Sequence, residues 1–282
     1  MMVMYFANLH LHSTYSDAGF TPTQLVYLGK ALGYGALALT DHETDGGCAE
    51  FMRAANREGI KAITGAEFYG KVDGQAVHLT ALDFDRENPE LRGYIKKRCA
   101  LFEERTRKCV EFGIEKGILK ITWDDVLEVA QEGTWICIDT VFETLRRKRA
   151  IPEEGLPYVR SNVFKAPEML AQKPKYPAAE EVIRAVRNAG GVIALAHPNE
   201  AMLGCVESLV AMGLNGIEIC HPSVPEEVAK LATEAAKKYN LYHCGGTDHT
   251  GPMSSCGGKY AIPAYQGISE EDFNILTERR LG

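Results

Sequence analysis

The sequence of 282 residues contains no cysteine pair in a C-x-x-C arrangement and only two tryptophans. Its eight cysteines lack the regular spacing of a disulfide framework, so we expect reduced thiols. No apolar run approaches the roughly 18–20 residues that a membrane-spanning helix requires. The first residues also lack the basic leader and the small-residue cleavage site of a secretory signal. These absences predict a cytoplasmic protein with no membrane partner.

Basic residues are fewer than acidic ones, with 31 Lys and Arg against 38 Asp and Glu and a net charge of −7. Such an acidic balance argues against a protein whose main task is to bind long nucleic acid. The acidic residues are unevenly distributed along the chain. Residues 89–176 are net basic, with 17 basic and 14 acidic side chains. This segment is suited to an anionic ligand, although most of its charges are expected to be ordinary solvated side chains.

Short apolar runs alternate with amphipathic segments along most of the chain, which is typical of an α/β fold with roughly seven strands in a barrel-like order. Residues 89–176 interrupt this order, since they are rich in helix formers and carry five prolines. We therefore expect a discontinuous barrel from residues 1–88 and 177–282, with a mostly helical insertion at 89–176 covering the face that carries the candidate site. The expected strands are residues 6–10, 36–40, 60–66, 68–72, 75–82, 192–196, 216–219 and 241–245.

Histidine is absent from residues 79 to 196, over a third of the chain. One of the eight histidines, His78, lies on the return strand of an expected hairpin. The other seven lie at or just past the C-terminal end of an expected strand, or on the last strand: His10, His12, His42, His197, His221, His243 and His249. Barrel enzymes assemble their active sites at that face, so the pattern favours a metal site. Simple packing explains His221 and His243 equally well.

Two motifs support this interpretation. His10 and His12 are two residues apart, so on a strand both imidazoles point to the same side. Asp17 follows at loop distance. The apolar run 36–39 ends abruptly in Thr40, Asp41 and His42, which a purely structural strand does not require.

The dipeptide Asp73-Gly74 predicts a tight hairpin. Glu67, expected at the end of the third strand, and His78 then share one face as diagonal neighbours. A buried carboxylate is costly without a partner, so a cation is expected beside Glu67. The pairs set by a two-residue turn are Val72 with Gln75, Tyr69 with His78, and Glu67 with Thr80.

Further candidate ligands follow the expected strands 192–196 and 241–245, namely His197, Asp248 and His249. Imidazoles combined with carboxylates suit Zn²⁺, Mn²⁺ or Fe²⁺ rather than Ca²⁺ or a thiolate-bound metal. The candidates outnumber the ligands that one ion can use. We therefore expect two or three divalent ions, with phosphate as product or ligand.

Taken together, the motifs resemble the PHP (polymerase and histidinol phosphatase) family. The resemblance implies a distorted (β/α)7 barrel whose metal site hydrolyses phosphoesters. Stand-alone members that act on nucleoside monophosphates, nucleoside bisphosphates or short oligoribonucleotides are the most similar. The motifs are, in order, His10-x-His12 with Ser16-Asp17, Thr40-Asp41-His42, Gly65-Ala66-Glu67 with His78, Ala196-His197-Pro198, and Gly246-Thr247-Asp248.

The resemblance also implies which residues hold the ions. A first ion would be held by His10, His12, Glu67 and Asp248. Glu67 would bridge to a second ion, completed by His78 and His197, and a third would be held by Asp17 and His42, with His249 as a further candidate ligand. Asp17, His42 and His249 are the expected catalytic residues.

Three positions depart from the family pattern. The family usually has a histidine two residues after the last aspartate, whereas this chain has Thr250 there and His249 one position earlier. Ala18 replaces the usual glycine after Asp17. Residues 135–139 take the place of the Arg-x-His element of the nucleotide phosphatases, which leaves the nucleotide substrate open.

The sequence therefore predicts metal-dependent hydrolysis of a phosphomonoester, such as a nucleotide, a nucleoside bisphosphate or another small phosphorylated metabolite. The basic run 146–149 would steer the anionic substrate or simply form a solvated helix face. The alternatives are an exonuclease or oligoribonuclease acting on short nucleic acid, a metal-dependent amidohydrolase, and a metal-bound module without enzymatic activity.

Overall fold

The computed structural model of the protein describes residues 5–251 and 265–281. Its strands form a three-stranded parallel sheet in the order β1-β2-β3 and a five-stranded mixed sheet in the order β4-β5-β6-β7-β8. The strands are β1 (Ala7–Asn8), β2 (Ala36–Ala38), β3 (Lys61–Ile63), β4 (Gly65–Val72), β5 (Gln75–Leu82), β6 (Val192–Leu195), β7 (Gly216–Cys220) and β8 (Tyr242–Gly245).

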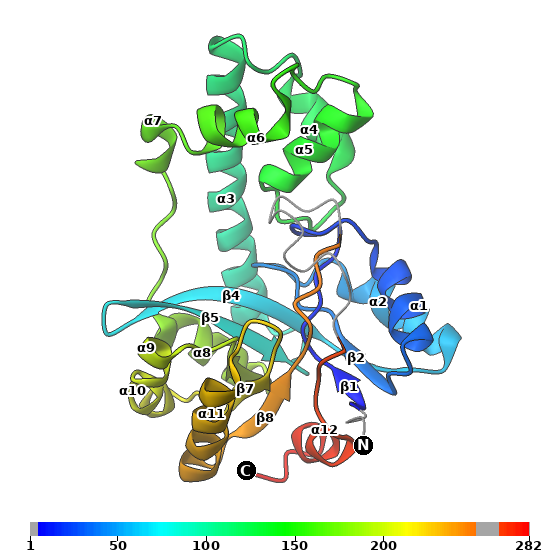
Figure 1. The fold of residues 1–282 in the computed structure, drawn as a ribbon, viewed down its shortest axis with the longest axis vertical. Helices are drawn as coiled ribbons and strands as arrows, with labels where there is room; N and C mark the ends of the chain where they lie inside the picture. Colours follow the sequence, from blue (N-terminus) through cyan, green and yellow to red (C-terminus); the bar gives the residue numbers. More distant parts are fainter. Residues whose placement is uncertain (1–4, 252–264, 282) are drawn as a thin grey trace.

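Helices connect most of these strands, and Figure 1 shows the long α3 rising from the sheets with α4, α5 and α6 near its far end. Asn88 sets the start of α3, because its side chain accepts hydrogen bonds from the first-turn N–H groups of Glu90 and Leu91. None of the described helices has the length and apolar character needed to cross a membrane. The helical segments are α1 (Pro22–Ala31), α2 (Cys48–Glu58), α3 (Pro89–Glu115), α4 (Trp123–Val129), α5 (Ile138–Arg147), α6 (Gly155–Val159), the π-helix η1 (Arg160–Phe164), α7 (Pro167–Leu170), α8 (Ala179–Asn188), α9 (Glu200–Leu203), α10 (Val206–Ala211), α11 (Glu226–Tyr239) and α12 (Glu270–Thr277).

The α/β class is confirmed, whereas the described strands form two sheets rather than one closed barrel. Backbone hydrogen bonds nevertheless join the two sheets beyond the strand ends. The N–H of Leu9 donates to the carbonyl of Gly245 at 3.0 Å, and the N–H of Glu67 donates to the carbonyl of Asp41 at 3.0 Å. These links bring the C-terminal ends of strands from both sheets together.

The expected strand 60–66 is split at Thr64, which corrects the position of Glu67. The Thr64 hydroxyl donates to the carbonyl of Phe84 at 2.8 Å and accepts from its N–H at 2.9 Å, so the chain leaves the first sheet at this point. Glu67 therefore lies within β4, paired with Thr80 on β5, and not at the end of β3.

The predicted hairpin is confirmed with its register, including the pairs Tyr69–His78 and Val72–Gln75. Asp73 and Gly74 have φ angles of 49° and 80°. Positive φ at both central residues is what a two-residue hairpin turn of this type requires. The turn thus places Glu67 and His78 on the same face of the hairpin.

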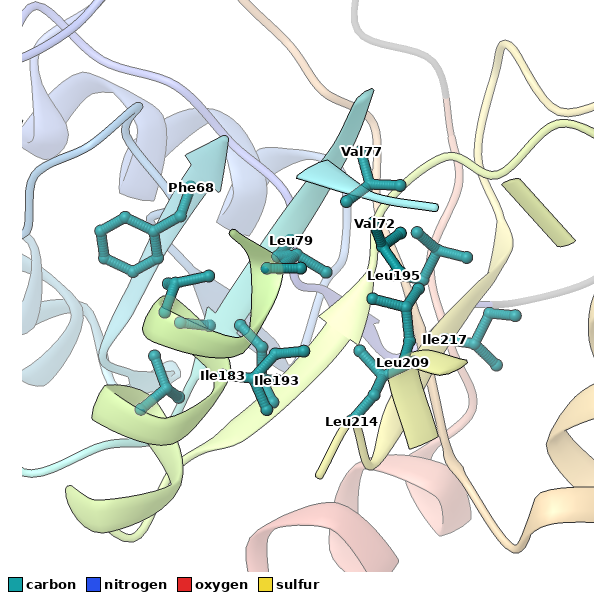
Figure 2. Packing of buried hydrophobic residues seen from close by; sticks show 14 of the residues in the cluster. Phe68, Val72, Val77, Leu79, Ile183, Ile193, Leu195, Leu209, Leu214 and Ile217 are labelled. Carbon is teal, nitrogen blue, oxygen red and sulfur yellow. The ribbon is translucent and has the colours of Figure 1, made fainter. Parts of the chain in front are cut away.

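An apolar core supports the five-stranded sheet from the side of α8 and α10 (Figure 2). Phe68, Leu79, Ile193 and Leu195 of the strands form one cluster with Ile183 of α8 and Leu209 of α10, and all are fully buried. Complete burial of one such side chain contributes roughly 1.5–3 kcal/mol. This packing fixes the strands whose ends carry the candidate ligands.

The cysteines that the structure describes are free and form no disulfide: Cys48, Cys99, Cys109, Cys137, Cys205, Cys220 and Cys244. Cys256 lies outside the described residues.

Candidate metal centre

Eight predicted ligands lie close together where the strand ends of both sheets meet. His10 and His12 are 0% and Glu67 is 1% exposed. The side chains of His42, His78, His197 and Asp248 are partly exposed. In four groups of three residues, one ligand atom from each residue lies within 4.8 Å of the others. The groups are His10–His12–Glu67, His12–Asp17–His42, Glu67–His78–His197 and His10–Glu218–His221.

The first group is centred on the His-x-His pair. The Nε2 atoms of His10 and His12 lie 3.2 Å apart, and Oδ1 of Asp248 is 2.9 Å from the latter. Oε2 of Glu67 lies 3.6 Å from His10 Nε2 and 3.5 Å from His12 Nε2. Two imidazole nitrogens and two carboxylate oxygens therefore face one small volume, a donor set that fits a divalent cation.

The second group uses the other oxygen of Glu67. Its Oε1 lies 3.0 Å from Nδ1 of His78 and 3.0 Å from Nε2 of His197. The backbone of His197 has a φ of 29°, an uncommon value for a non-glycine residue. Glu67 thus stands between two sets of imidazoles, as a bridging ligand would.

The third group contains Asp17 and His42. Asp17 Oδ2 is 3.7 Å from His42 Nε2, and Asp17 Oδ1 is 3.6 Å from His12 Nδ1. That nitrogen of His12 is buried, and the described residues offer it no hydrogen-bond partner. His42 Nδ1 also lies 2.9 Å from Glu67 Oε2. An orphaned buried nitrogen beside a carboxylate fits a cation at this position.

His249 lies apart from these groups. Its ring stacks on Phe20 with centroids 5.5 Å apart, and its carbonyl accepts a hydrogen bond from the N–H of His12. Asp248, which faces the ligand cluster, has a φ of 50°, so the chain is not extended at this point. The metal-binding and catalytic roles of His249 therefore remain predictions.

The carboxylates of the cluster dominate its electrostatics. Burial alone would lower the pKa of His10, but Glu218, Glu67 and Asp248 raise it well above the usual value. Burial likewise opposes the charged form of His42, yet Glu67 and Asp17 raise its pKa to about 10. Burial would raise the pKa of Glu67, but the surrounding histidines hold it well below the usual range. The carboxylates thus remain ionised and favour positive charge beside them.

His78 differs from its neighbours, because burial lowers its pKa despite the attraction of Glu67. A lowered pKa keeps the imidazole neutral near pH 7. Neutral imidazole is the form of histidine that binds metal ions.

Sequence reasoning missed Glu218, a fully buried carboxylate on β7. It accepts hydrogen bonds from Nδ1 of His10 at 2.7 Å and from the N–H of His197 at 2.7 Å. Although burial opposes its ionisation, His10 lowers the pKa of Glu218 to about 2. The sequence signal for Glu218 is that it is the single acidic residue inside the apolar strand 216–219.

The two histidines left open by the sequence have different surroundings. His221 is buried, its Nε2 lies 3.5 Å from Asp248 Oδ2, and its Nδ1 accepts from the N–H of Ser223. His243 instead lies 2.9 Å from Asp272 Oδ1 on α12. His221 therefore lies next to the ligand cluster. His243 lies away from it and pairs with Asp272 of α12.

A buried ion pair attaches the helices of residues 89–176 to the site. Arg98 of α3 donates from Nε to Glu43 Oε2 at 2.9 Å and from Nη2 to Glu43 Oε1 at 3.1 Å. Glu43 directly follows His42 and also accepts from the N–H of Tyr69 at 3.1 Å. The pair thus ties α3 to the loop that carries a predicted ligand.

A cavity of about 390 Å³ has Tyr69 and Trp135 among its lining residues. Both contact a predicted ligand, because the ring of His42 stacks on that of Tyr69 with centroids 5.1 Å apart and lies 5.4 Å from that of Trp135. The lining of the cavity includes five aromatic and four basic residues, namely Tyr69, Phe102, Trp135, Phe164 and Tyr176 with Arg105, Arg160, Lys165 and Lys173.

The basic run 146–149 lies elsewhere. Arg146 and Arg147 line a separate cavity of about 340 Å³, and both pair with Glu143 on the same helix. Lys148 pairs with Asp125 and Glu128. These ion pairs agree with a solvated helix face.

An α/β fold that gathers buried imidazoles and carboxylates at its strand ends defines a metal-dependent hydrolase. Comparisons with known proteins narrow this class. Residues 8–131 match the model of the PHP domain. The chain is 30% identical to a 5'-3' exoribonuclease of Haemophilus influenzae over 89% of its own length and 90% of the relative. It is 27% identical to a 3',5'-nucleoside bisphosphate phosphatase of Chromobacterium violaceum, with 87% of each chain covered.

A solved structure from Bifidobacterium adolescentis, described as a candidate metal-dependent phosphoesterase, has a similar fold. Its TM-score is 0.76 at 27% identity, and the match covers 97% of this chain and 96% of that one. The chain belongs to the PHP family, a family of metal-dependent phosphoesterases.

Proposed function

We propose that the protein hydrolyses the phosphomonoester of a small nucleotide-like metabolite at a centre of two or three divalent ions. The observation that carries this proposal is the position of Glu67, whose two oxygens face different sets of imidazoles at 2.9–3.6 Å. A carboxylate shared in this way supports neighbouring ions, the arrangement used in many phosphoester hydrolases.

Zn²⁺, Mn²⁺ or Fe²⁺ suits the mixed nitrogen and oxygen donors. One ion would be held by His10, His12, Glu67 and Asp248, and a second by Glu67, His78 and His197. Asp17 and His42 would hold a third, with His249 as a further candidate. When bound, such ions polarise phosphoryl oxygens and lower the pKa of water.

The protein's own groups orient and enclose this centre. Asp17 and His42 border the reacting phosphoryl group in this proposal, and either the third ion would neutralise the leaving oxygen or His249 would protonate it. Tyr69 and Trp135 cover the ring of His42 on the side of the cavity. These rings restrict the access of bulk water from that side.

The cavity supports a substrate with a planar ring and a second anionic group. Aromatic side chains bind nucleobases by stacking, and Arg or Lys side chains bind phosphate. Trp135 is 7% exposed, and the described residues offer no acceptor to its indole Nε1–H, which leaves this donor for a ligand. We therefore favour a nucleoside bisphosphate over a simple sugar phosphate.

A second candidate is removal of nucleotides from the 5′ end of short RNA. The cavity favours it through the same rings and basic groups, which also suit the second nucleotide of an oligomer. The net charge of −7 disfavours long nucleic acid in either case.

We also propose that residues 1–88 and 177–282 form a distorted (β/α)7 barrel, with residues 89–176 inserted over the candidate site. The hydrogen bonds that join the two sheets at Leu9 and Glu67 support this description.

A hydrolysis screen tests the proposal. Nucleoside bisphosphates, mononucleotides, sugar phosphates, histidinol phosphate and 5′-phosphorylated oligoribonucleotides would be compared, with metal content measured on the same sample. We expect phosphate release that is highest for nucleoside bisphosphates and is lost on metal removal. Cleavage of amides without cleavage of phosphoesters would favour an amidohydrolase. Tight metal retention without any turnover would favour a structural module.

A further inference from the structure

We infer that Glu218 is a positioning residue that couples two of the proposed metal positions by holding one ligand of each. The inference rests on the proposed metal centre. Glu218 lies on β7, which contributes none of the predicted ligands, and its side chain is completely enclosed. Its two oxygens hold His10, from the first group, and His197, from the second.

The contact with His10 fixes the tautomer of that imidazole. Oε1 of Glu218 lies 2.7 Å from His10 Nδ1 and 3.2 Å from the hydroxyl oxygen of Thr80. An ionised carboxylate only accepts hydrogen bonds, so Nδ1 of His10 carries the proton. The lone pair of a neutral His10 is then on Nε2, the atom that faces His12 and Glu67. A carboxylate behind a metal-binding histidine orients the ring and makes it a better ligand.

The contact with His197 acts on the backbone instead. Oε2 of Glu218 accepts the N–H of His197 at 2.7 Å, at a residue whose φ of 29° is strained. This hydrogen bond stabilises the backbone conformation that places the His197 ring against Glu67. One carboxylate therefore sets the orientation of a ring in one group and the backbone of a ligand in the other.

A glutamine cannot reproduce this arrangement. His10 and Thr80 donate to one oxygen of Glu218, and His197 donates to the other. Glutamine has a single acceptor oxygen and an NH₂ group that only donates, so at least one of these donors must face another donor. Glu218→Gln therefore preserves the volume of the side chain while disrupting the position of one ligand.

The test is a metal titration of purified full-length protein. Wild type, Glu218→Gln and the exposed control Glu227→Gln are stripped of metal and titrated with Zn²⁺ and Mn²⁺ against a competing chelator. We expect Glu218→Gln to bind the first and second ions roughly 10–100-fold more weakly, the usual effect of losing an outer partner. We expect Glu227→Gln to match the wild type. Equal dissociation constants for Glu218→Gln and the wild type overturn the inference.

A second measurement does not depend on the variant folding. In the Zn²⁺-loaded wild type, ¹⁵N spectra of the histidine rings report which nitrogen of His10 carries the proton. We expect a proton on Nδ1 and metal on Nε2. Metal on Nδ1 of His10, or Glu218 bound directly to an ion, overturns the inference. If the wild type neither binds metal nor hydrolyses phosphoesters, the proposed function itself fails, which separates the two outcomes.

Discussion

Oε1 of Glu67 lies 3.0 Å from Nε2 of His197, although the two residues are 130 positions apart in the chain. The other oxygen of Glu67 lies 2.9 Å from Nδ1 of His42. The hairpin of β4 and β5 thus places one carboxylate between ligands from both sheets. Loss of this carboxylate should weaken the binding of more than one ion.

Glu67→Gln should lower kcat/KM for the best phosphomonoester by at least about 100-fold, equivalent to roughly 2.7 kcal/mol. The variant keeps the volume of the side chain but removes the charge that the neighbouring histidines stabilise. Metal analysis of the same sample should show at least one ion fewer per chain than in the wild type. Glu227→Gln serves as the matched control on an exposed helix. Full metal content with wild-type activity would contradict the bridging role.

Removal of metal should destabilise the fold. Ions that bind the native state alone stabilise it in proportion to the logarithm of their concentration over Kd. Without ions, the buried carboxylate of Glu67 and the partly exposed carboxylate of Asp248 lose strong partners. Thermal unfolding after chelation should show a lower Tm that Mn²⁺ or Zn²⁺ restores. A Tm unchanged by chelator would indicate that no ion stabilises this cluster.

Trp135→Ala should impair recognition of substrate outside the reacting phosphate. Loss of one stacking partner costs about 1–3 kcal/mol, so KM for a nucleoside bisphosphate should rise roughly 5–150-fold. The KM for a phosphomonoester without a base should change little, since it does not reach the cavity. Trp123→Phe, in α4, is the control for general effects of tryptophan loss. Equal effects on both substrates would argue against base stacking in the cavity.

Arg98→Met should destabilise the protein by about 3–5 kcal/mol, because it leaves the buried carboxylate of Glu43 without its ion pair. Urea unfolding measures this change. The double variant Arg98→Met with Glu43→Leu should recover much of the loss. Arg92→Met removes an exposed pair with Glu87 and should cost less than about 1 kcal/mol. Similar losses from both arginines would contradict the structural role of Arg98.

The sequence predicted the proximity of the candidate ligands better than their surroundings. The two-residue spacing past the end of β1 places His10 beside His12, and the Asp73-Gly74 turn fixes the hairpin register. Both follow from local geometry. The hydrogen bond between Glu218 and His10, in contrast, joins residues that are 208 positions apart in the chain. An acidic residue in an apolar strand indicates that it has a buried hydrogen-bond partner, but it does not show which residue that partner is.

Two other features also depended on distant contacts. The split of the expected third strand arises from hydrogen bonds between Thr64 and Phe84, a residue beyond the hairpin. The cavity needs aromatic and basic side chains from β4 and from several helices of residues 89–176. How those helices pack against one another is not encoded in any short motif.

The pair formed by His243 and Asp272 should make stability depend on pH. Partial burial opposes ionisation of Asp272, but hydrogen bonds from His243 and Ser269 lower its pKa below the usual value. A carboxyl group whose pKa is lowered by folding stabilises the native state above its unfolded pKa of about 4. That contribution disappears as the pH falls through the lower pKa of the folded protein.

Asp272→Asn should therefore reduce the free energy of unfolding by about 1 kcal/mol at pH 7 and have little effect in strong acid. Urea unfolding of both proteins from pH 7 down to about pH 2 measures the difference. A difference that stays constant with pH would contradict the assigned shift.

The central claim is that imidazoles and carboxylates from distant parts of the chain hold several divalent ions around Glu67. Anomalous diffraction from crystals of the active protein loaded with Mn²⁺ or Zn²⁺ tests it most directly. We expect at least two peaks per chain, both within about 2.0–2.2 Å of Glu67 oxygens and bordered by the named histidines. Protein that hydrolyses phosphomonoesters while showing no ion at Glu67 would contradict it.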